Sequence, residues 1–238
     1  MHVLFVGDSH GCVRHLIGAV WALQAHRNIQ LDLIVQVGDF HAYAPGNYPV
    51  DDWFVANNPA ELDAQDIATP GSSLERELDD VASRLDCPIH VITGNHEDFA
   101  WLAGTHSQQG ELAKLDAHGV FTHVADGATV TLSETTIGYL GMIDAPGTRY
   151  DFNPGALEKL HELAPGSVDI LVTHDNPRGY QDTQAGRETG GSDRLSALID
   201  HLQPWLHVGG HIHQVFEQRI GATRSRTLNM LVPPASDR

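Results

Sequence analysis

Short apolar runs that end in polar residues alternate with amphipathic stretches along the chain. The first run, residues 2–6, stops at Gly7, and apolar residues then recur at helical spacing over 13–23. Further strands are predicted at 31–37, 89–92, 168–172 and 205–208, and further helices at 72–85, 156–163 and 192–202. Ser72, followed three residues later by Glu75, fits a helix capping box. This alternation favours an α/β fold whose parallel strands all end at one edge.

Two regions depart from that alternation. Residues 120–124, 129–132 and 136–142 are predicted as consecutive strands of a second, more antiparallel sheet, and a short helix is predicted between Gly110 and His118. The segment 41–71 is rich in proline, aspartate and aromatic residues and lacks periodicity. A segment of this kind forms either a lid over a binding site or an insertion that packs on the surface, and the sequence leaves both open.

Composition limits the class of protein. The 238 residues fit a single domain, 1–238, and 41% of them are hydrophobic. We expect a cytoplasmic protein without a membrane segment, because no apolar run is long enough to cross a bilayer and no signal-peptide pattern opens the chain. Cys12 and Cys87 are expected to be reduced thiols. The formal net charge of −17 argues against binding to extended nucleic acid.

Polar side chains capable of binding metal follow all five predicted parallel strands. They are Asp8, His10, Asp39, Asn95, His96, His174, His211 and His213. Because such strand ends meet at one edge of a sheet, these side chains are expected to converge. Carboxylate, imidazole and amide donors together suit manganese, iron, zinc, cobalt or nickel better than calcium. The sequence therefore predicts a metal site, and one carboxylate shared by two ions would make it dinuclear.

The segments GDSHG, GDF, GNHE, TH and GGHIH occur in this order between Gly7 and His213. This series resembles the signature of the calcineurin-like metallophosphoesterases. The resemblance implies a four-layer α/β/β/α sandwich of two mixed sheets and a hydrolase with two divalent metal ions. It assigns Asp8, His10 and His213 to one ion, Asn95, His174 and His211 to the other, and Asp39 to both.

The same resemblance implies a reaction. His96 would stay free of metal and either protonate the leaving oxygen of a phosphoester or stabilise the charge that develops there. A hydroxide between the two ions would attack phosphorus in line. His41, Arg149 and Arg178 are weaker candidates for substrate contact, since a surface role for the arginines and a loop role for His41 explain them equally well.

The branch of the family is less defined. The second motif lacks the GDxxDRG pattern of protein phosphatases, whereas GDFHA, TGNHE and THDNP resemble segments of the RNA lariat debranching enzyme. That enzyme has a cysteine where Asp8 stands here. We therefore expect a phosphodiesterase or phosphatase acting on a small or nucleotide-like substrate. The alternatives are a non-catalytic interaction scaffold, which would be free to lose ligands, and a single-metal hydrolase or lyase.

Overall fold

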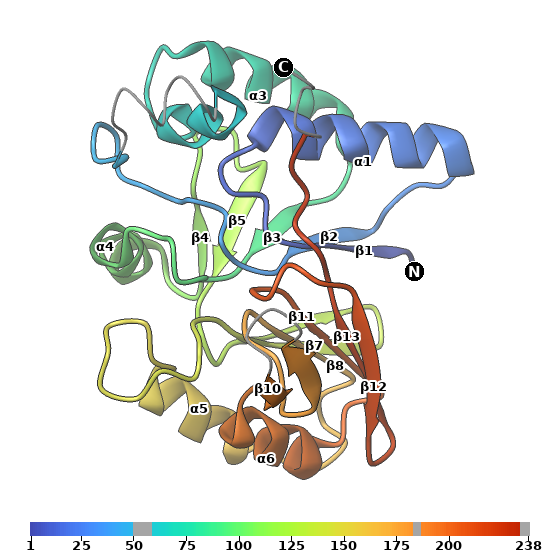
Figure 1. Ribbon diagram of the computed structural model, residues 1–238. Coiled ribbons are helices and arrows are strands. Elements are labelled where there is room, and N and C mark those ends of the chain that lie inside the picture. The colour runs from blue at the N-terminus through green and yellow to red at the C-terminus, as the bar shows by residue number, and fades with distance from the viewer. Residues whose placement is uncertain (50–58, 183–186, 234–238) are drawn as a thin grey trace.

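Two β-sheets face each other between two layers of helices in the computed structural model, which describes residues 1–49, 59–182 and 187–233 (Figure 1). The predicted irregular segment 41–71 lies partly outside these ranges, including its aromatic residues Trp53 and Phe54. In the described part of this segment, η1 (Pro59–Asp66) is a 3-10 helix that the sequence pattern did not predict. No helix of the described ranges is both long and apolar enough to cross a bilayer.

The first sheet has the strand order β1-β2-β3-β5-β4. Its strands are β1 (Val3–Val6), β2 (Leu33–Gln36), β3 (Ile89–Val91), β5 (Phe121–Val124) and β4 (Leu112–Lys114). The first four run parallel, and β4 joins antiparallel at the edge. Three of the predicted metal-binding loops therefore leave this sheet from neighbouring strands β1, β2 and β3, which end on the same side.

The second sheet has the order β12-β13-β11-β8-β7-β6. Its strands are β12 (Phe216–Ile220), β13 (Thr223–Thr227), β11 (Leu206–Gly209), β8 (Ile170–Thr173), β7 (Thr135–Leu140) and β6 (Thr129–Leu132). The four central strands are parallel and both edge strands are antiparallel. A separate hairpin pairs β9 (Tyr180–Asp182) with β10 (Arg187–Gly190). The remaining predicted loops follow β8 and β11.

Three hydrophobic cores hold the layers together. The first packs α1 (Val13–Arg27), α3 (Ser73–Arg84) and α4 (Phe99–Gln109) on the first sheet. The second lies between the sheets, and the third packs α5 (Pro154–His161) and α6 (Asp193–Leu202) on the second sheet. The chain thus has the four-layer α/β/β/α arrangement of two mixed sheets that the family resemblance implied (Figure 1).

Three local predictions were wrong or incomplete. The helix predicted between Gly110 and His118 is instead strand β4 and a tight turn, because the Asp116 carboxylate accepts the backbone N–H groups of His118, Val120 and Phe121. Strand β5 belongs to the first sheet, parallel to β3, and not to the second sheet. Helix α4 and the β12–β13 hairpin were not predicted at all.

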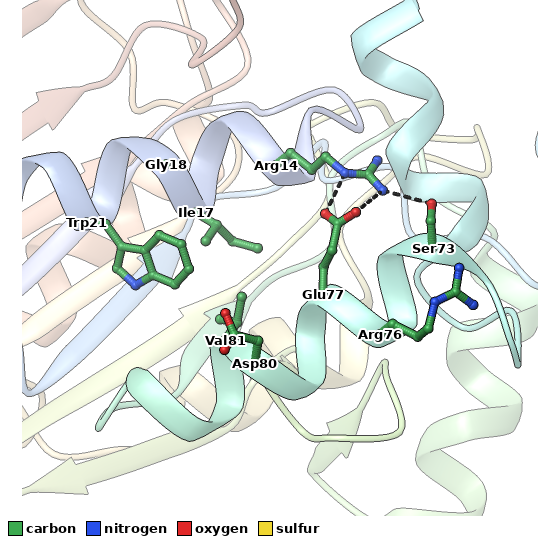
Figure 2. A pocket seen from close by; sticks show the side chains of 9 residues that line it. All are labelled: Arg14, Ile17, Gly18, Trp21, Ser73, Arg76, Glu77, Asp80 and Val81. Atoms are coloured by element: carbon green, nitrogen blue, oxygen red, sulfur yellow. Dashed lines mark hydrogen bonds and ion pairs between the residues drawn. The ribbon is translucent and has the colours of Figure 1, made fainter.

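A groove of about 510 Å³ lies between α1 and α3 (Figure 2). Arg14 joins the two helices there, since its guanidinium donates to both carboxylate oxygens of Glu77 at 2.7 and 3.0 Å. The same guanidinium pairs with Asp63 of η1. Arg14 therefore fastens η1 and α3 to the start of α1, the helix that follows the first predicted metal loop.

The N-cap at the start of α3 yields a stability prediction. Only half of the expected capping box forms, since the Glu75 carboxylate accepts the Gly71 N–H and not the Ser72 N–H. The Ser72 hydroxyl accepts the Glu75 N–H at 3.0 Å and donates to the Asp66 carbonyl at 3.1 Å. We expect Ser72→Ala to lower the free energy of unfolding by about 1 kcal/mol, the usual cost of losing an N-cap. Urea denaturation measures the change. Ser83→Ala on the same helix is the control, and an equal loss there would contradict the capping role.

Three buried histidines predict how stability depends on pH. Burial lowers the pKa of His90 to about 4 and the pKa of His123 and His207 to about 3. Their neutral imidazoles hydrogen-bond to neighbours; His207 lies between Thr173 and Ser225 at 2.8 Å from each hydroxyl. Because the unfolded chain protonates these groups at higher pH than the folded chain, this stabilisation is complete above an ordinary histidine pKa and is lost toward acid.

We therefore expect the free energy of unfolding to fall by about 1.4 kcal/mol per pH unit for each such histidine below about pH 6. Urea denaturation at a series of pH values gives the slope. His207→Gln should make that slope shallower, whereas the exposed His26→Gln should leave it unchanged. Identical slopes in the wild type and in His207→Gln would show that His207 does not contribute.

Candidate metal centre

Metal-ligand side chains from both sheets meet where the parallel strands end. The loops after β1, β2 and β3 bring Asp8, His10, Asp39 and Asn95, and the loops after β8 and β11 bring His174, His211 and His213. Two groups of ligand atoms result, and within each group the atoms lie within 4.8 Å of one another. The groups are Asp8, His10, Asp39 and His213, and Asp39, His174 and His211.

In the first group, the His213 Nε2 atom lies 3.0 Å from both the Asp8 Oδ2 atom and the His10 Nε2 atom. Two donors that are each about 2.1 Å from a shared transition-metal ion, at right angles, lie about 3.0 Å apart. The spacing of these three donors therefore fits a small divalent ion. Asp8 is fully buried and also accepts the His211 N–H, which joins the β1 loop to the β11 loop.

In the second group, a hydrogen bond at Nδ1 fixes the orientation of the His174 ring. Its Nδ1 atom donates to the Val37 carbonyl at 2.9 Å, which turns Nε2 toward Asp39 Oδ1 at 3.4 Å and Asn95 Oδ1 at 3.1 Å. A backbone carbonyl that holds the second ring nitrogen is a common support for a metal-bound histidine. Burial alone would lower the pKa of His174, but Asp39 raises it to about 10, so this position attracts positive charge.

Asp39 contributes a carboxylate to both groups and also hydrogen-bonds to the backbone of the loop after β3. Its Oδ1 atom accepts the N–H groups of Asn95 and His96 at 2.8 and 3.0 Å. Gly94 makes this approach possible, since a Cβ atom there would lie 2.1 Å from the Asp39 nitrogen. Burial would raise the pKa of Asp39, but His174 and the neighbouring histidines hold it well below its usual range. The carboxylate is therefore ionised and available to cations.

Glu97 holds the metal loops in place without itself belonging to either group. Its buried carboxylate accepts the N–H groups of Phe40 at 2.9 Å, Ala42 at 2.6 Å and Gly94 at 3.3 Å. The residue between the first two, His41, has a left-handed backbone with φ 66°. Burial and the charge of Asp39 raise the pKa of Glu97 to about 7. Glu97 thus fastens the loop after β2 to the loop after β3.

His96 stands beside the metal groups. Its side chain is exposed, and its ring centroid lies 5.8 Å from that of His10 and 5.7 Å from that of His41. In the described part of the chain, it is not among the clustered ligand atoms of either group. The His96 imidazole is therefore exposed to solvent next to the rings of His10 and His41.

The three weaker candidates lie in different places. His41 contacts the cluster, because its Nε2 atom is 3.0 Å from His10 Nδ1 and its Nδ1 atom is 2.6 Å from the Tyr48 hydroxyl. Arg149 stacks on Tyr150, with its guanidinium carbon 4.9 Å from the ring centroid. Arg178 is ion-paired with Asp193 on the exposed side of α6 and is not brought into the cluster.

Sequence reasoning missed the supporting residues more often than the cluster itself. Tyr48 supports His41, and Glu97 links the loops after β2 and β3. Both roles depend on tertiary contacts, which no local sequence pattern indicates. The Asp98 carboxylate accepts the Trp101 N–H at 3.1 Å at the start of α4. A capping residue after a motif is thus a signal that could have located this helix.

Parts of the chain are similar in sequence to named proteins of other organisms. The chain is 31% identical to UPF0046 protein K07C11.7 of Caenorhabditis elegans over 137 residues, which are 52% of this chain and 45% of that protein. It is 39% identical to the human metallophosphoesterase domain-containing protein 1 over 61 residues, which are 25% of this chain and 19% of that protein. The chain therefore matches less than half the length of either relative.

Solved structures share the fold at low sequence identity. One crystal structure superposes with a TM-score of 0.57 and 14% identity over 96% of this chain and 90% of its own. A Staphylococcus aureus protein solved in complex with alpha-ketoglutarate gives 0.52 and 16% over 96% of this chain and 48% of its own. Residues 1–215 match the family described as calcineurin-like phosphoesterase, and the chain belongs to that family.

Proposed function

We propose that this protein is a phosphoester hydrolase that uses two divalent metal ions. The observation that carries the proposal is the convergence of seven metal-ligand side chains from five strand ends around one shared carboxylate, Asp39, with the exposed imidazole of His96 beside them. Manganese, iron, zinc, cobalt and nickel all accept such mixed oxygen and nitrogen donors. When bound, the ions would polarise a phosphoryl oxygen and lower the pKa of a water molecule.

The proposed ligand sets follow the two groups of donors. Asp8, His10 and His213 would hold one ion, and His174, His211 and Asn95 would hold the other, with Asp39 touching both. Asn95 is included in the second set because its Oδ1 atom lies 3.1 Å from the His174 Nε2 atom. A neutral amide oxygen adds a ligand without adding negative charge. The centre would then keep a net positive charge that favours a phosphate group.

The residues of the chain would divide the remaining work. His96, exposed next to the cluster, would give a proton to the leaving oxygen or hydrogen-bond to it as charge develops. Asp39 would position the loop that carries His96, because its carboxylate accepts the backbone N–H groups of Asn95 and His96. The proposed substrates are small or nucleotide-like phosphomonoesters and phosphodiesters, since the chain has no net positive charge for extended nucleic acid.

We also propose that His41 orients His10 and does not contact substrate. His41 Nε2 meets His10 Nδ1, the ring nitrogen that faces away from the cluster, while His10 Nε2 faces His213. The Tyr48 hydroxyl at 2.6 Å in turn fixes His41. A partner on the outer nitrogen sets the tautomer and the direction of a metal-bound imidazole.

The proposed reaction predicts how metal removal and substitutions at the site affect hydrolysis. Removal of metals with a chelator should abolish hydrolysis of 4-nitrophenyl phosphate or of its diester, and Mn²⁺ should restore it. Asp39→Asn and His211→Ala should stay inactive after Mn²⁺ is added. His96→Ala should bind the same number of ions but lose about 100-fold or more in kcat, most severely with poor leaving groups. Elemental analysis gives the stoichiometry.

Several outcomes would contradict the proposal. Full activity of Asp39→Asn in the absence of metal would exclude the dinuclear mechanism. Loss of an ion in His96→Ala would show that His96 is a ligand. One bound ion per chain in the active wild type would favour a single-metal enzyme. Two bound ions without hydrolysis of any monoester or diester would favour an interaction scaffold.

The orienting role of His41 has a test that does not depend on turnover. We expect His41→Ala to weaken Mn²⁺ binding at one of two sites by about 10-fold to 100-fold, the usual effect of removing a residue that supports a ligand. Tyr48→Phe should have a smaller effect in the same direction. Calorimetric titration measures both, and His26→Ala, an exposed histidine of α1, is the control. Normal Mn²⁺ binding with a raised KM would instead make His41 a substrate contact.

A further inference from the structure

A cavity of about 280 Å³ lies against the loop that carries Asn95 and His96, on the side of α4. Thr93 and Phe99, which line it, stand at the two ends of that loop. The other lining residues come from α4, from β5 and the turn after it, and from the segment between β7 and α5. They are Leu102, Ala103, His106, His123, Ala125, Asp126, Met142 and Asn153. The cavity is thus separate from the metal groups but next to them.

Five of the ten residues that line this cavity are apolar and suit a flat ring. Phe99, Leu102 and Ala103 line it from α4, and Met142 and Ala125 line it from the other elements. An aromatic ring and a thioether both pack well against planar aromatic groups. A planar organic group could therefore occupy the cavity with its faces against these side chains.

One end of the cavity carries the carboxylate of Asp126, with His106 also in the lining. Asp126 accepts the Gly141 N–H at 2.8 Å and a hydrogen bond from the Thr93 hydroxyl, and no arginine or lysine of the described residues pairs with it. Burial raises its pKa to about 6, and the Gly141 N–H, His106 and the Thr93 hydroxyl oppose that rise. A carboxylate has about four acceptor positions, and two are used here. The remaining capacity is available to N–H donors of a ligand.

A chain of buried polar side chains holds this end rigid. His106 Nε2 lies 2.7 Å from His123 Nδ1, and His123 Nε2 lies 3.2 Å from the Thr93 hydroxyl. His106 is held in turn by the Gly110 carbonyl at 2.6 Å from its Nδ1 atom. Fixed donors and acceptors of this kind give a pocket selectivity for the hydrogen-bonding edge of its ligand.

Arg149 lies close to the cavity, and Tyr43 lies close to the histidine cluster. The Arg149 guanidinium carbon lies 6.0 Å from the Phe99 ring centroid. Its positive charge also opposes the burial that raises the pKa of Tyr43 to about 12. The Tyr43 ring lies 6.4 Å from the ring of His41, which contacts His10. Arg149 thus provides a cation near the Phe99 side of the cavity.

We infer that this cavity binds a planar nitrogen heterocycle with an amino group, recognised by the Asp126 carboxylate and enclosed by Phe99 and Met142. The heterocycle would be part of the alcohol side of a phosphoester whose phosphate lies at the metal centre, and this second statement rests on the proposed function. Asp126 and Phe99 then act as specificity residues, because the amino group gives the carboxylate a donor that a simple aryl ring lacks.

Binding of adenosine to the protein without added metal tests the cavity independently of hydrolysis. We expect calorimetry to detect adenosine and to give an affinity at least about tenfold lower for purine riboside, which lacks the amino group. Asp126→Asn and Ala103→Leu should each weaken adenosine binding about tenfold, the first by removing charge and the second by filling the cavity. Ala103 is exposed on α4, so the larger side chain is compatible with folding.

Two control variants match these changes. Ala100→Leu adds the same side chain elsewhere on α4, and Glu134→Gln removes a negative charge at an exposed turn; neither residue lines the cavity. Equal effects of variants and controls, or no adenosine binding, would overturn the inference. For the link to hydrolysis, Asp126→Asn should reduce kcat/KM about tenfold more for adenosine monophosphate than for 4-nitrophenyl phosphate. Equal losses would leave a binding pocket that is not part of the substrate site.

Discussion

The Asp39 carboxylate ties together parts of the chain that are far apart in sequence. It supplies an atom to both groups of metal-ligand side chains, and it accepts two backbone N–H groups from the loop after β3. This combination fixes the position of the His96 backbone relative to the cluster, because the His96 N–H donates directly to Asp39. A close approach of two loops is needed, and Gly94 permits it because even one additional carbon atom would clash with Asp39.

That approach requires unusual backbone conformations, and they occur at the site residues. His10, Asp39, His41, His211 and His213 all have left-handed backbones although none is glycine. Such conformations cost free energy and persist where surrounding contacts impose them. Glu97 imposes them on one loop, since its carboxylate accepts N–H groups on both sides of His41. The strain in this loop is therefore balanced by buried hydrogen bonds.

The sequence revealed the cluster better than it revealed the fold around it. Apolar runs followed by Asp, Asn or His are local patterns, so the strands and their terminal residues could be predicted. The turn at Asp116 and the clamp at Glu97 could not, because both depend on which backbone N–H groups the tertiary structure brings near a carboxylate. Strand β5 was assigned to the wrong sheet for a related reason: order along the chain does not give order in a sheet. The cavity residues come from four elements and form no motif.

The pairing of arginines with acids bears on how an acidic chain of this family could bind a phosphate group. Many of its arginines are already neutralised by acids: Arg14 by Asp63 and Glu77, Arg178 by Asp193, Arg194 by Asp144 and Asp151, and Arg224 and Arg226 by Glu217. The negative charge of a phosphate would therefore have to be met by cations held at Asp8 and Asp39. Arg149 differs from these arginines, since it stacks on Tyr150 and has no acidic partner among the described residues. Its guanidinium carbon lies 6.0 Å from the Phe99 ring centroid, so this cation is available to the anionic part of a ligand near the cavity.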